Sequence, residues 1–538
     1  MPADTRQRNL LIVSDLHLSE GRHTATQKYS PHEDFFFDEE FARFLEHYQK
    51  QQPPGSWHLI INGDFLDLLQ VICLDGAPAA ADRDYGPGCS EKETVFKLGK
   101  IVEGHPLFFE ALAKFVAAGN LLTIIKGNHD VEFHFPAVRA SLIRELRAVG
   151  PQGLPGHNIN SISDKSVLFC DWFYYEKDRL WVEHGNQYDA INTFRYWLSP
   201  LLPQMANWPP QRQDEIDLPW GSLFVRYLFN RIEGVEPFAD NIKPQTKFLA
   251  WLIRKHPITA FRFAREEGVY LLGRIRRAWA HLPEDAYEMR RQQHEECLQQ
   301  LARQWGMLPA DLHNIDNLRA PSVLKQPSGW WSVGRTLVRY RLFQPLLYVS
   351  VGLVTLAVLL GIWPLAVIYL PNQIRAALMD AWIFTDAGQT ALFILQLLAL
   401  IPVLTAVVYF FRWLFTPEEP RKPGPFKTVA RAIAERLKVE YVVMGHTHNP
   451  DLQRLDNGRE YFNTGTWTRV FSEEERLLRE DVEFTFLEGV RKDGQLRLKL
   501  MKWDDEAEEP RLLPLLEDEA FPQSAQPEPL RKAAGKAA

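Results

Sequence analysis

The chain has 538 residues, enough for about three or four domains of ordinary size. With 46% hydrophobic and 24% charged residues it is not a wholly disordered or collagen-like chain. A net charge of -7, from 61 basic and 68 acidic residues, provides no general attraction to a polyanion, so nucleic acid is not expected as a partner. The cysteines are far apart and form no CxxC pair, which argues against a disulfide framework or a thiolate zinc site. They are Cys73, Cys89, Cys170 and Cys297.

The first 190 residues alternate strand-like and helix-like segments. Short apolar runs at Asn9–Ser14, Trp57–Asn62 and Leu121–Lys126 predict buried strands. Between them, Asp34–Gln49 and Val95–Ala118 carry the apolar spacing of helices. This order of strand, helix and strand predicts an α/β fold with a parallel sheet.

The next segments predict a hairpin followed by a helical insertion. Ser166–Tyr175 and Arg179–Glu183 are predicted to pair across a turn at Lys177 and Asp178. Residues 191–340 have no strand pattern and are predicted to be helical. Within them, the basic and aromatic run Trp251–Trp279 suits an anionic membrane surface or a phosphate-bearing substrate, or equally a solvated helix face.

Two long apolar runs predict a transmembrane helical hairpin. Leu346–Leu370 carries no charged residue, and Ala391–Phe411 is nearly as apolar. Each is longer than the roughly 20 residues that span a bilayer, although buried core helices are the alternative. Basic residues flank the pair outside the connecting loop, so the positive-inside rule places both ends in the cytosol. We therefore predict a multi-pass protein of the inner or plasma membrane, with a cytoplasmic catalytic domain and the lipid bilayer as a partner.

After the apolar runs the α/β pattern resumes. Pro425–Lys438 predicts an amphipathic helix, Tyr441–Met444 a strand, and Asp456–Gly458 and Lys492–Gly494 hairpin turns. The chain from about Asp504 is acidic and then rich in Pro and Ala, which predicts a disordered tail. The predicted units are a catalytic domain in two parts at 1–190 and 416–505, the helical insertion at 191–340, the membrane hairpin at 341–415 and the tail at 506–538.

Residues of the types that bind metals follow several of the predicted strands. They are Asp15 and His17 in SDLH, Asp64 in NGDFLD, Asn128 and His129 in KGNHD, His184 in VEHGN, and His446 and His448 in MGHTH. In open α/β sheets, sites form beyond the carboxyl ends of the strands, so these side chains are expected to converge. Because a strand alternates faces, Asp15 and His17 are expected to project to one side, as are His446 and His448 if the strand geometry continues through them.

These five segments, in this order, resemble the calcineurin-like metallophosphoesterase superfamily, whose pattern is DxH, GDxxD, GNHD or GNHE, a lone His, and GHxH. The resemblance covers residues 9–190 and 425 to about 505. It implies a four-layer αββα sandwich that holds two divalent metal ions. Carried over by position, it assigns one metal to Asp15, His17, Asp64 and His448, and the other to Asp64, Asn128, His184 and His446. Asp64 would bridge the two metals, and His129 resembles the catalytic histidine of the family.

The chemistry explains why phosphoester hydrolysis needs such residues. Two cations about 3.5 to 4 Å apart acidify a bridging water and neutralise the phosphoryl oxygens. The resulting hydroxide attacks in line, and the leaving oxygen needs a proton, which His129 would supply. Oxygen and imidazole ligands without thiolate suit Mn, Fe or Zn, and manganese is favoured here. Asp67 is expected to orient a ligand. Asn463 and Thr466 resemble residues that lie near the metals in the family, but a plain turn explains them equally well.

Within the superfamily the nearest resemblance is to the UDP-2,3-diacylglucosamine pyrophosphatase branch. That branch carries arginine where His129 stands, carries Asp where Asn186 stands, and lacks the insertion and the apolar pair. The expected function is hydrolysis of a phosphate ester or pyrophosphate bond, with lipid-linked and sugar-nucleotide substrates expected first because of the predicted anchor. The alternatives are a nuclease or cyclic-nucleotide phosphodiesterase of the same superfamily, and a non-catalytic metal-binding membrane scaffold.

Overall fold

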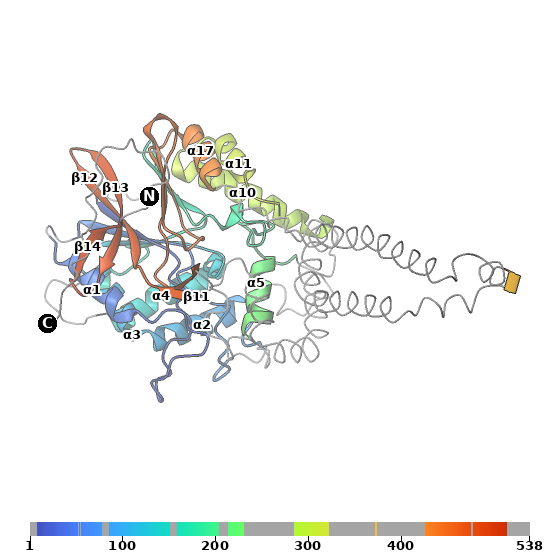
Figure 1. The fold of residues 1–538 in the computed structure, drawn as a ribbon, viewed down its shortest axis with the longest axis horizontal. Coiled ribbons are helices and arrows are strands. Elements are labelled where there is room, and N and C mark those ends of the chain that lie inside the picture. The colour runs from blue at the N-terminus through green and yellow to red at the C-terminus, as the bar shows by residue number, and fades with distance from the viewer. Residues whose placement is uncertain are drawn as a thin grey trace, which may run out of the picture.

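The computed structural model describes residues 8–51, 53, 55–77, 85–150, 159–203, 214–230, 284–321, 372–373, 426–474 and 477–513. These residues form a mixed α/β fold built on two large sheets (Figure 1). The strand order is β14-β13-β12-β1-β2-β3-β4 in the seven-stranded sheet and β5-β6-β7-β9-β8 in the five-stranded sheet.

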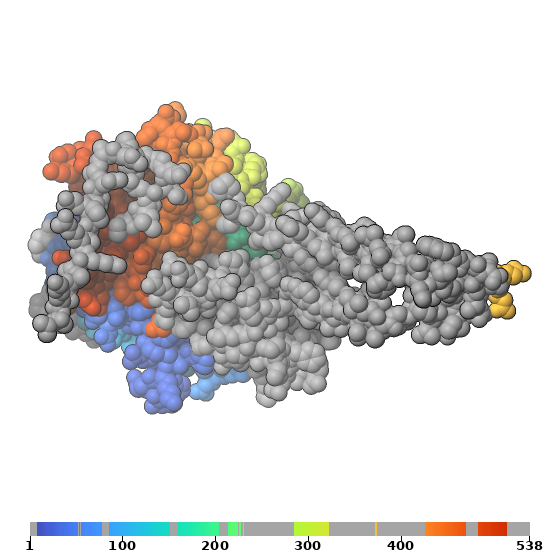
Figure 2. All heavy atoms as spheres, viewed as in Figure 1, coloured from blue at the N-terminus to red at the C-terminus, as the bar shows by residue number. Residues whose placement is uncertain are grey.

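The seven-stranded sheet joins the two ends of the sequence. Its parallel half consists of β1 (Asn9–Val13), β2 (Trp57–Asn62), β3 (Leu121–Ile125) and β4 (Val167–Cys170). Its antiparallel half consists of β12 (Thr485–Lys492), β13 (Gln495–Asp504) and β14 (Glu509–Leu512). The halves meet where β1 pairs with β12, and Figure 2 shows N-terminal residues in blue beside C-terminal residues in red.

The five-stranded sheet combines the middle of the chain with its C-terminal part. Its strands are β5 (Phe173–Glu176), β6 (Leu180–Glu183), β7 (Tyr441–Met444), β8 (Asp451–Arg454) and β9 (Glu460–Asn463). The antiparallel pairs β5–β6, β8–β9 and β12–β13 confirm the three predicted hairpin turns. A separate hairpin pairs β10 (Val470–Glu474) with β11 (Leu477–Asp481).

One predicted strand is wrong. Ser166–Tyr175 was expected to be a single strand, but it forms β4 and β5, which belong to different sheets. The break falls at Asp171 and Trp172, where the chain passes from one sheet to the other. Apolar periodicity cannot locate such a crossing, because apolar and aromatic residues run through both strands.

The two sheets pack face to face between layers of helices. On β1, Leu10 and Ile12 join a core with residues of the five-stranded sheet, such as Val182 and Val443. The alternate residues of β1 belong to the larger core, which also contains residues of the helices. This layering agrees with the expected αββα arrangement.

The helices lie on the outer sides of the two sheets (Figure 1). Four follow strands of the first sheet: α1 (Asp38–Gln49), α2 (Glu91–Gly104), α3 (Pro106–Ala117) and α4 (Pro136–Val149). Among the residues described further along the chain, the α-helices are α5 (Trp220–Phe224), α10 (Glu288–Trp305), α11 (Pro309–Asp316) and α17 (Phe426–Leu437). Helix α17 contacts β7 and β9, and α11 contacts α17. Short 3-10 or π turns lie at Val131–His134, Ile159–Ser161, Asn186–Tyr188, Val225–Phe229, Glu284–Tyr287 and Asp456–Gly458.

The predicted helix Val95–Ala118 is two helices. Its chain leaves the helical conformation at His105, which has φ -122° and ψ 53°. Pro106 follows, and a proline disfavours the helical conformation in the residue before it. Helix α3 then begins at that proline, a favoured first position.

The fold prediction is also corrected in its transmembrane hairpin. Across the described ranges, no helix combines the length and the apolar composition that crossing a bilayer requires. Helix α10 has 18 residues, but charged residues from Glu288 to Arg303 make it too polar for this. Residues 341–415, where the hairpin was expected, lie outside the described residues except for 372 and 373.

Two other predicted regions are described in part. The described residues of 191–340 hold short helical turns and α5, α10 and α11, together with an isolated bridge between Leu201 and Ile216. The run Trp251–Trp279 lies outside the described residues. Residues 506–538 were expected to form a disordered tail, but β14 lies within them and pairs with β13 in the sheet.

A buried charge cluster at the joint between α2 and α3 predicts a pH-dependent stability. His105 Nε2 lies 3.1 Å from Glu33 Oε2, and its Nδ1 lies 3.0 Å from Asp38 Oδ1. Burial alone lowers the pKa of a histidine, yet these carboxylates raise the pKa of His105 to about 10. The folded pKa is therefore above the unfolded value of about 6.5. The stabilisation is complete below that pH and is lost as the pH rises towards 10.

Below pH 6.5 we expect the wild type to have a larger free energy of unfolding than His105→Gln. As the pH rises through this window, the difference should shrink by on the order of 1 kcal/mol per pH unit. Urea unfolding of both proteins between pH 6 and 10 measures the difference. A difference that does not change with pH would contradict the charged state of His105.

Candidate metal centre

The strand ends bring the predicted residues of both sheets together. Strands β1, β2 and β3 run parallel in one sheet, and β6 and β7 run parallel in the other. The sheets are tied at these ends by Asn62 Nδ2, which donates to Glu183 O at 2.9 Å. Trp467 N and Thr466 Oγ1 both donate to Asp15 O. All seven predicted ligands are buried within this junction; they are Asp15, His17, Asp64, Asn128, His184, His446 and His448.

The backbone of the site is left-handed at five of these residues. Among the described residues, twelve non-glycine positions have positive φ, and five of them are predicted ligands. They are Asp15, His17, Asp64, His446 and His448, with φ between 47° and 68°. Such conformations cost free energy and cluster at functional sites. The prediction that Asp15 and His17 lie on one face of a strand is wrong, because β1 ends at Val13. Both residues lie in the turn that follows, where their left-handed backbone orients the side chains.

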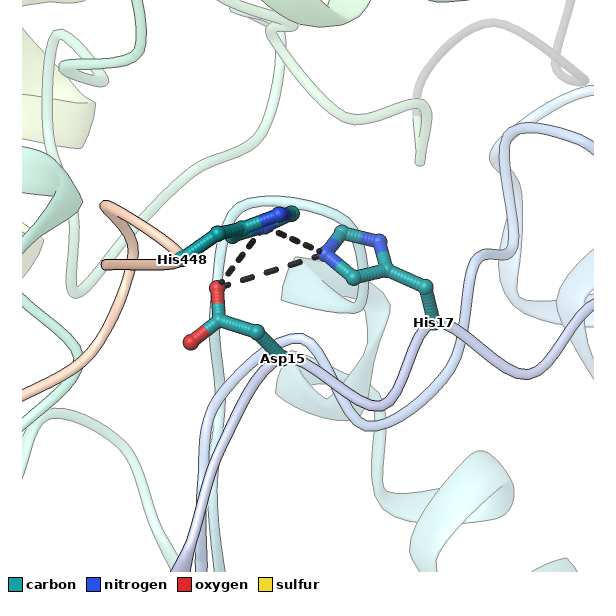
Figure 3. A group of neighbouring side chains, drawn as sticks. All are labelled: Asp15, His17 and His448. Carbon is teal, nitrogen blue, oxygen red and sulfur yellow. Dashed lines mark hydrogen bonds and ion pairs between the residues drawn. The ribbon is translucent and has the colours of Figure 1, made fainter. Parts of the chain in front are cut away.

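The first cluster is formed by Asp15, His17 and His448 (Figure 3). His17 Nε2 lies 3.1 Å from His448 Nε2, which lies 3.2 Å from Asp15 Oδ1. The distance from His17 Nε2 to Asp15 Oδ1 is 4.0 Å. Two imidazoles and a carboxylate thus direct one potential ligand atom each towards a common point.

The second cluster is formed by Asp64, His184 and His446, with Asn128 at its edge. His184 Nε2 lies 3.0 Å from Asp64 Oδ2 and 3.2 Å from Asn128 Oδ1. The other ring nitrogen, His184 Nδ1, donates to Asn62 O at 2.9 Å. In the neutral ring this bond places the proton on Nδ1 and leaves Nε2 able to bind a cation.

His129 lies beside both clusters and is held by Asp67. His129 Nδ1 is 2.6 Å from Asp67 Oδ2, and the same oxygen is 3.3 Å from His17 Nδ1. The backbone N of His129 donates to Asp64 Oδ1 at 2.9 Å. His17, Asp64 and His129 also come close enough to form a third potential ligand group. The predicted orienting residue Asp67 therefore contacts both a predicted ligand and the predicted catalytic residue.

The carboxylates and imidazoles of the site stabilise one another's charges. Burial alone raises the pKa of Asp64, but His184 and His129 hold it well below its usual range. Burial likewise lowers the pKa of His184, but Asp64 raises it to about 9. The pKa of Asp15 is lowered by His448 against the same effect of burial. A bound cation would take over this role from the imidazole protons, so metal binding would release them.

The residues present fit a divalent metal ion. Oδ1 of Asp15 is buried and accepts no hydrogen bond, although it faces two imidazole nitrogens. Buried carboxylate oxygens are normally satisfied, so an orphaned one inside a ring of ligand atoms suits a cation. Carboxylate, amide and imidazole groups without thiolate are of the kinds that bind divalent cations in proteins. These buried clusters can therefore hold metal ions.

Sequence reasoning missed two acidic residues that contact the predicted ligands or their loops. Asp130 accepts hydrogen bonds from the backbone N of Phe65 at 2.8 Å and of Gly127 at 2.6 Å, which ties two ligand loops together. Asp189 Oδ2 lies 3.2 Å from His446 Nε2. The motif GNHD contains Asp130, so its position was a usable signal. Nothing in the sequence links Asp189 to a histidine 257 positions later.

The loop glycines allow the closest contacts in the site. A Cβ at Gly127 would lie 2.1 Å from Asp64 Oδ1 and 2.3 Å from Asp64 N. We expect Gly127→Ala to displace Asp64 and reduce metal content, measured by elemental analysis of the purified protein. Gly99→Ala is the control, because a Cβ at Gly99 in α2 meets nothing within 4 Å. An unchanged metal content in Gly127→Ala would contradict the close packing of these two loops.

Comparisons with known proteins add no assignment. No model of a protein family matches the chain, and no curated protein matches its sequence. The geometry of the site and the five motifs are therefore the grounds for inferring what the protein does.

Proposed function

We infer that the protein is a hydrolase of phosphate esters or pyrophosphates that uses two divalent metal ions. One observation carries the proposal, namely the position of Asp64 between the two clusters. Asp64 Oδ2 lies 3.0 Å from His184 Nε2 in one cluster and 3.9 Å from His17 Nε2 in the other. A carboxylate placed in this way is suited to bridge two cations. The order and spacing of the five motifs support the same conclusion.

Each metal has a proposed set of ligands. Asp15, His17, Asp64 and His448 would hold one ion, and Asp64, Asn128, His184 and His446 would hold the other. The ions would polarise the phosphoryl group and make water a stronger nucleophile at neutral pH. Manganese is the proposed metal, since oxygen and imidazole ligands without sulfur suit it.

His129 is proposed to protonate the leaving oxygen. Its side chain is 14% exposed, so it can reach a substrate, and its Nδ1 is engaged by Asp67 at 2.6 Å. A carboxylate acceptor keeps the proton on Nδ1 in the neutral ring and stabilises the charged imidazolium. In the imidazolium, Nε2 also carries a proton and can deliver it to the leaving group. Asp67 thus holds His129 in place and stabilises its protonated form.

Two chromogenic esters test the proposal. We expect the Mn-loaded protein to hydrolyse p-nitrophenyl phosphate or bis(p-nitrophenyl) phosphate, and to lose this activity after chelation and regain it when Mn is restored. The preferred ester separates a phosphomonoesterase from a phosphodiesterase such as a nuclease. A protein that binds Mn but turns over neither ester nor a nucleoside diphosphate sugar would overturn the proposal in favour of a non-catalytic metal-binding protein.

A further inference from the structure

Asp189 is an acidic residue outside the five motifs that contacts a proposed ligand. Its Oδ2 lies 3.2 Å from His446 Nε2. The carboxylate is also held within its own loop by Ile191 N, which donates to Oδ1 at 3.0 Å, and by Asn192 Nδ2, which donates to Oδ2 at 2.8 Å. Asp189 is therefore fixed before any ion binds, and only 23% of its side chain is exposed.

Two other imidazoles of the site follow one rule. His184 donates from Nδ1 to Asn62 O at 2.9 Å, and its Nε2 faces the second cluster. His17 places Nδ1 3.3 Å from Asp67 Oδ2, and its Nε2 faces the first cluster. In each ring one nitrogen meets an acceptor and the other is directed to the ligand group. The acceptor sets the tautomer, and the tautomer sets the ligand atom.

His446 reverses this assignment, because its Nε2 meets the acceptor. We propose that Asp189 is a positioning residue that fixes the proton of His446 on Nε2 and thereby makes Nδ1 its metal-binding atom. The inference rests on the proposed dinuclear function and deepens it. It assigns the second metal, held by Asp64, Asn128, His184 and His446, a dependence on Asp189 that the first metal does not share.

The acceptor is a carboxylate, and its charge has a second effect. A carboxylate bonded to the far nitrogen of a ligating imidazole increases the basicity of that ligand, and loss of such a partner weakens metal affinity by about 10- to 100-fold. Asp189→Asn removes the charge and leaves an amide of the same shape. We expect this variant to bind the second Mn about 10- to 100-fold more weakly and the first Mn as the wild type does.

Direct Mn titration tests this expectation without any assay of activity. The full chain is freed of metal by chelation, and Mn binding is followed by equilibrium dialysis and by electron paramagnetic resonance. The wild type should show two bound ions with a spin-coupled spectrum. At a Mn concentration that just saturates both sites of the wild type, Asp189→Asn should show one bound ion and an uncoupled spectrum. The matched control is Asp316→Asn, because Asp316 Oδ2 lies 3.3 Å from His294 Nε2 on α10, an imidazole outside the clusters.

A double-mutant cycle separates positioning from a general loosening of the loop. If Asp189 acts through His446, then Asp189→Asn should cause no further loss of Mn affinity in a His446→Ala background. An additive loss in the double variant would overturn the inference, as would a single variant with two wild-type affinities. A wild type that binds no Mn, or binds two ions without hydrolysing any ester, would instead count against the proposed function.

Discussion

Replacement of Asp64 by alanine is expected to abolish turnover and to deplete both metals. Asp64 Oδ2 lies 3.0 Å from His184 Nε2 and 3.9 Å from His17 Nε2, so its loss would remove a proposed ligand from both clusters. A catalytic metal ion contributes several kcal/mol to transition-state stabilisation, so the proposed two-metal function predicts a fall in kcat/KM of at least about 1,000-fold. Ester hydrolysis and elemental analysis of the same preparation measure the two effects.

The control for Asp64→Ala must carry the same backbone penalty. Asp64 has φ 47°, and the exposed turn residue Asp178 has φ 60°, so alanine is disfavoured at both positions for the same reason. Asp178→Ala should therefore lose some stability and keep its metal and activity. Full metal occupancy in Asp64→Ala would refute the bridging assignment, whatever the activity.

The convergence of the metal clusters was predictable from the sequence. Parallel strands place their carboxyl ends at one edge of a sheet, and each motif follows an apolar run that forms a strand. Asp15, Asp64 and Asn128 therefore had to lie close together once β1, β2 and β3 were adjacent. That His184 and His446 would face them from a second sheet depended on the motif pattern, because apolar runs do not reveal which sheet a strand joins.

Other features depended on contacts that no local pattern encodes. The left-handed turns at His446 and His448 follow β7 directly, and the spacing GHTH reads equally well as an extended strand. Strands β4 and β5 are separated by two residues yet lie in different sheets. Asp189 is held by its own loop and meets His446 only in the folded chain. Long apolar runs predicted a membrane hairpin from composition alone, and none of the described helices has the length and apolar composition to span a bilayer.

Replacement of His129 by alanine is expected to separate turnover from metal binding. His129 Nδ1 is bonded to Asp67 Oδ2 at 2.6 Å, so its side chain is already oriented by a group other than a metal. As a general acid it should contribute about 10²- to 10⁴-fold to kcat. We expect His129→Ala to lose activity by this factor while binding nearly as much Mn as the wild type. Ester hydrolysis and Mn content are measured on the same preparation of the variant.

The competing assignment makes His129 a ligand, because His17, Asp64 and His129 also form a potential ligand group. A loss of one Mn per chain in His129→Ala would establish that role and contradict the proton donor. The leaving group provides a further test, since a proton donor matters most for a poor leaving group. His129→Ala should therefore be impaired far more with an alkyl phosphate ester than with a p-nitrophenyl ester, whose phenolate leaves without a proton. A ligand role would impair both esters alike, because the metals act on the phosphoryl group that the two substrates share.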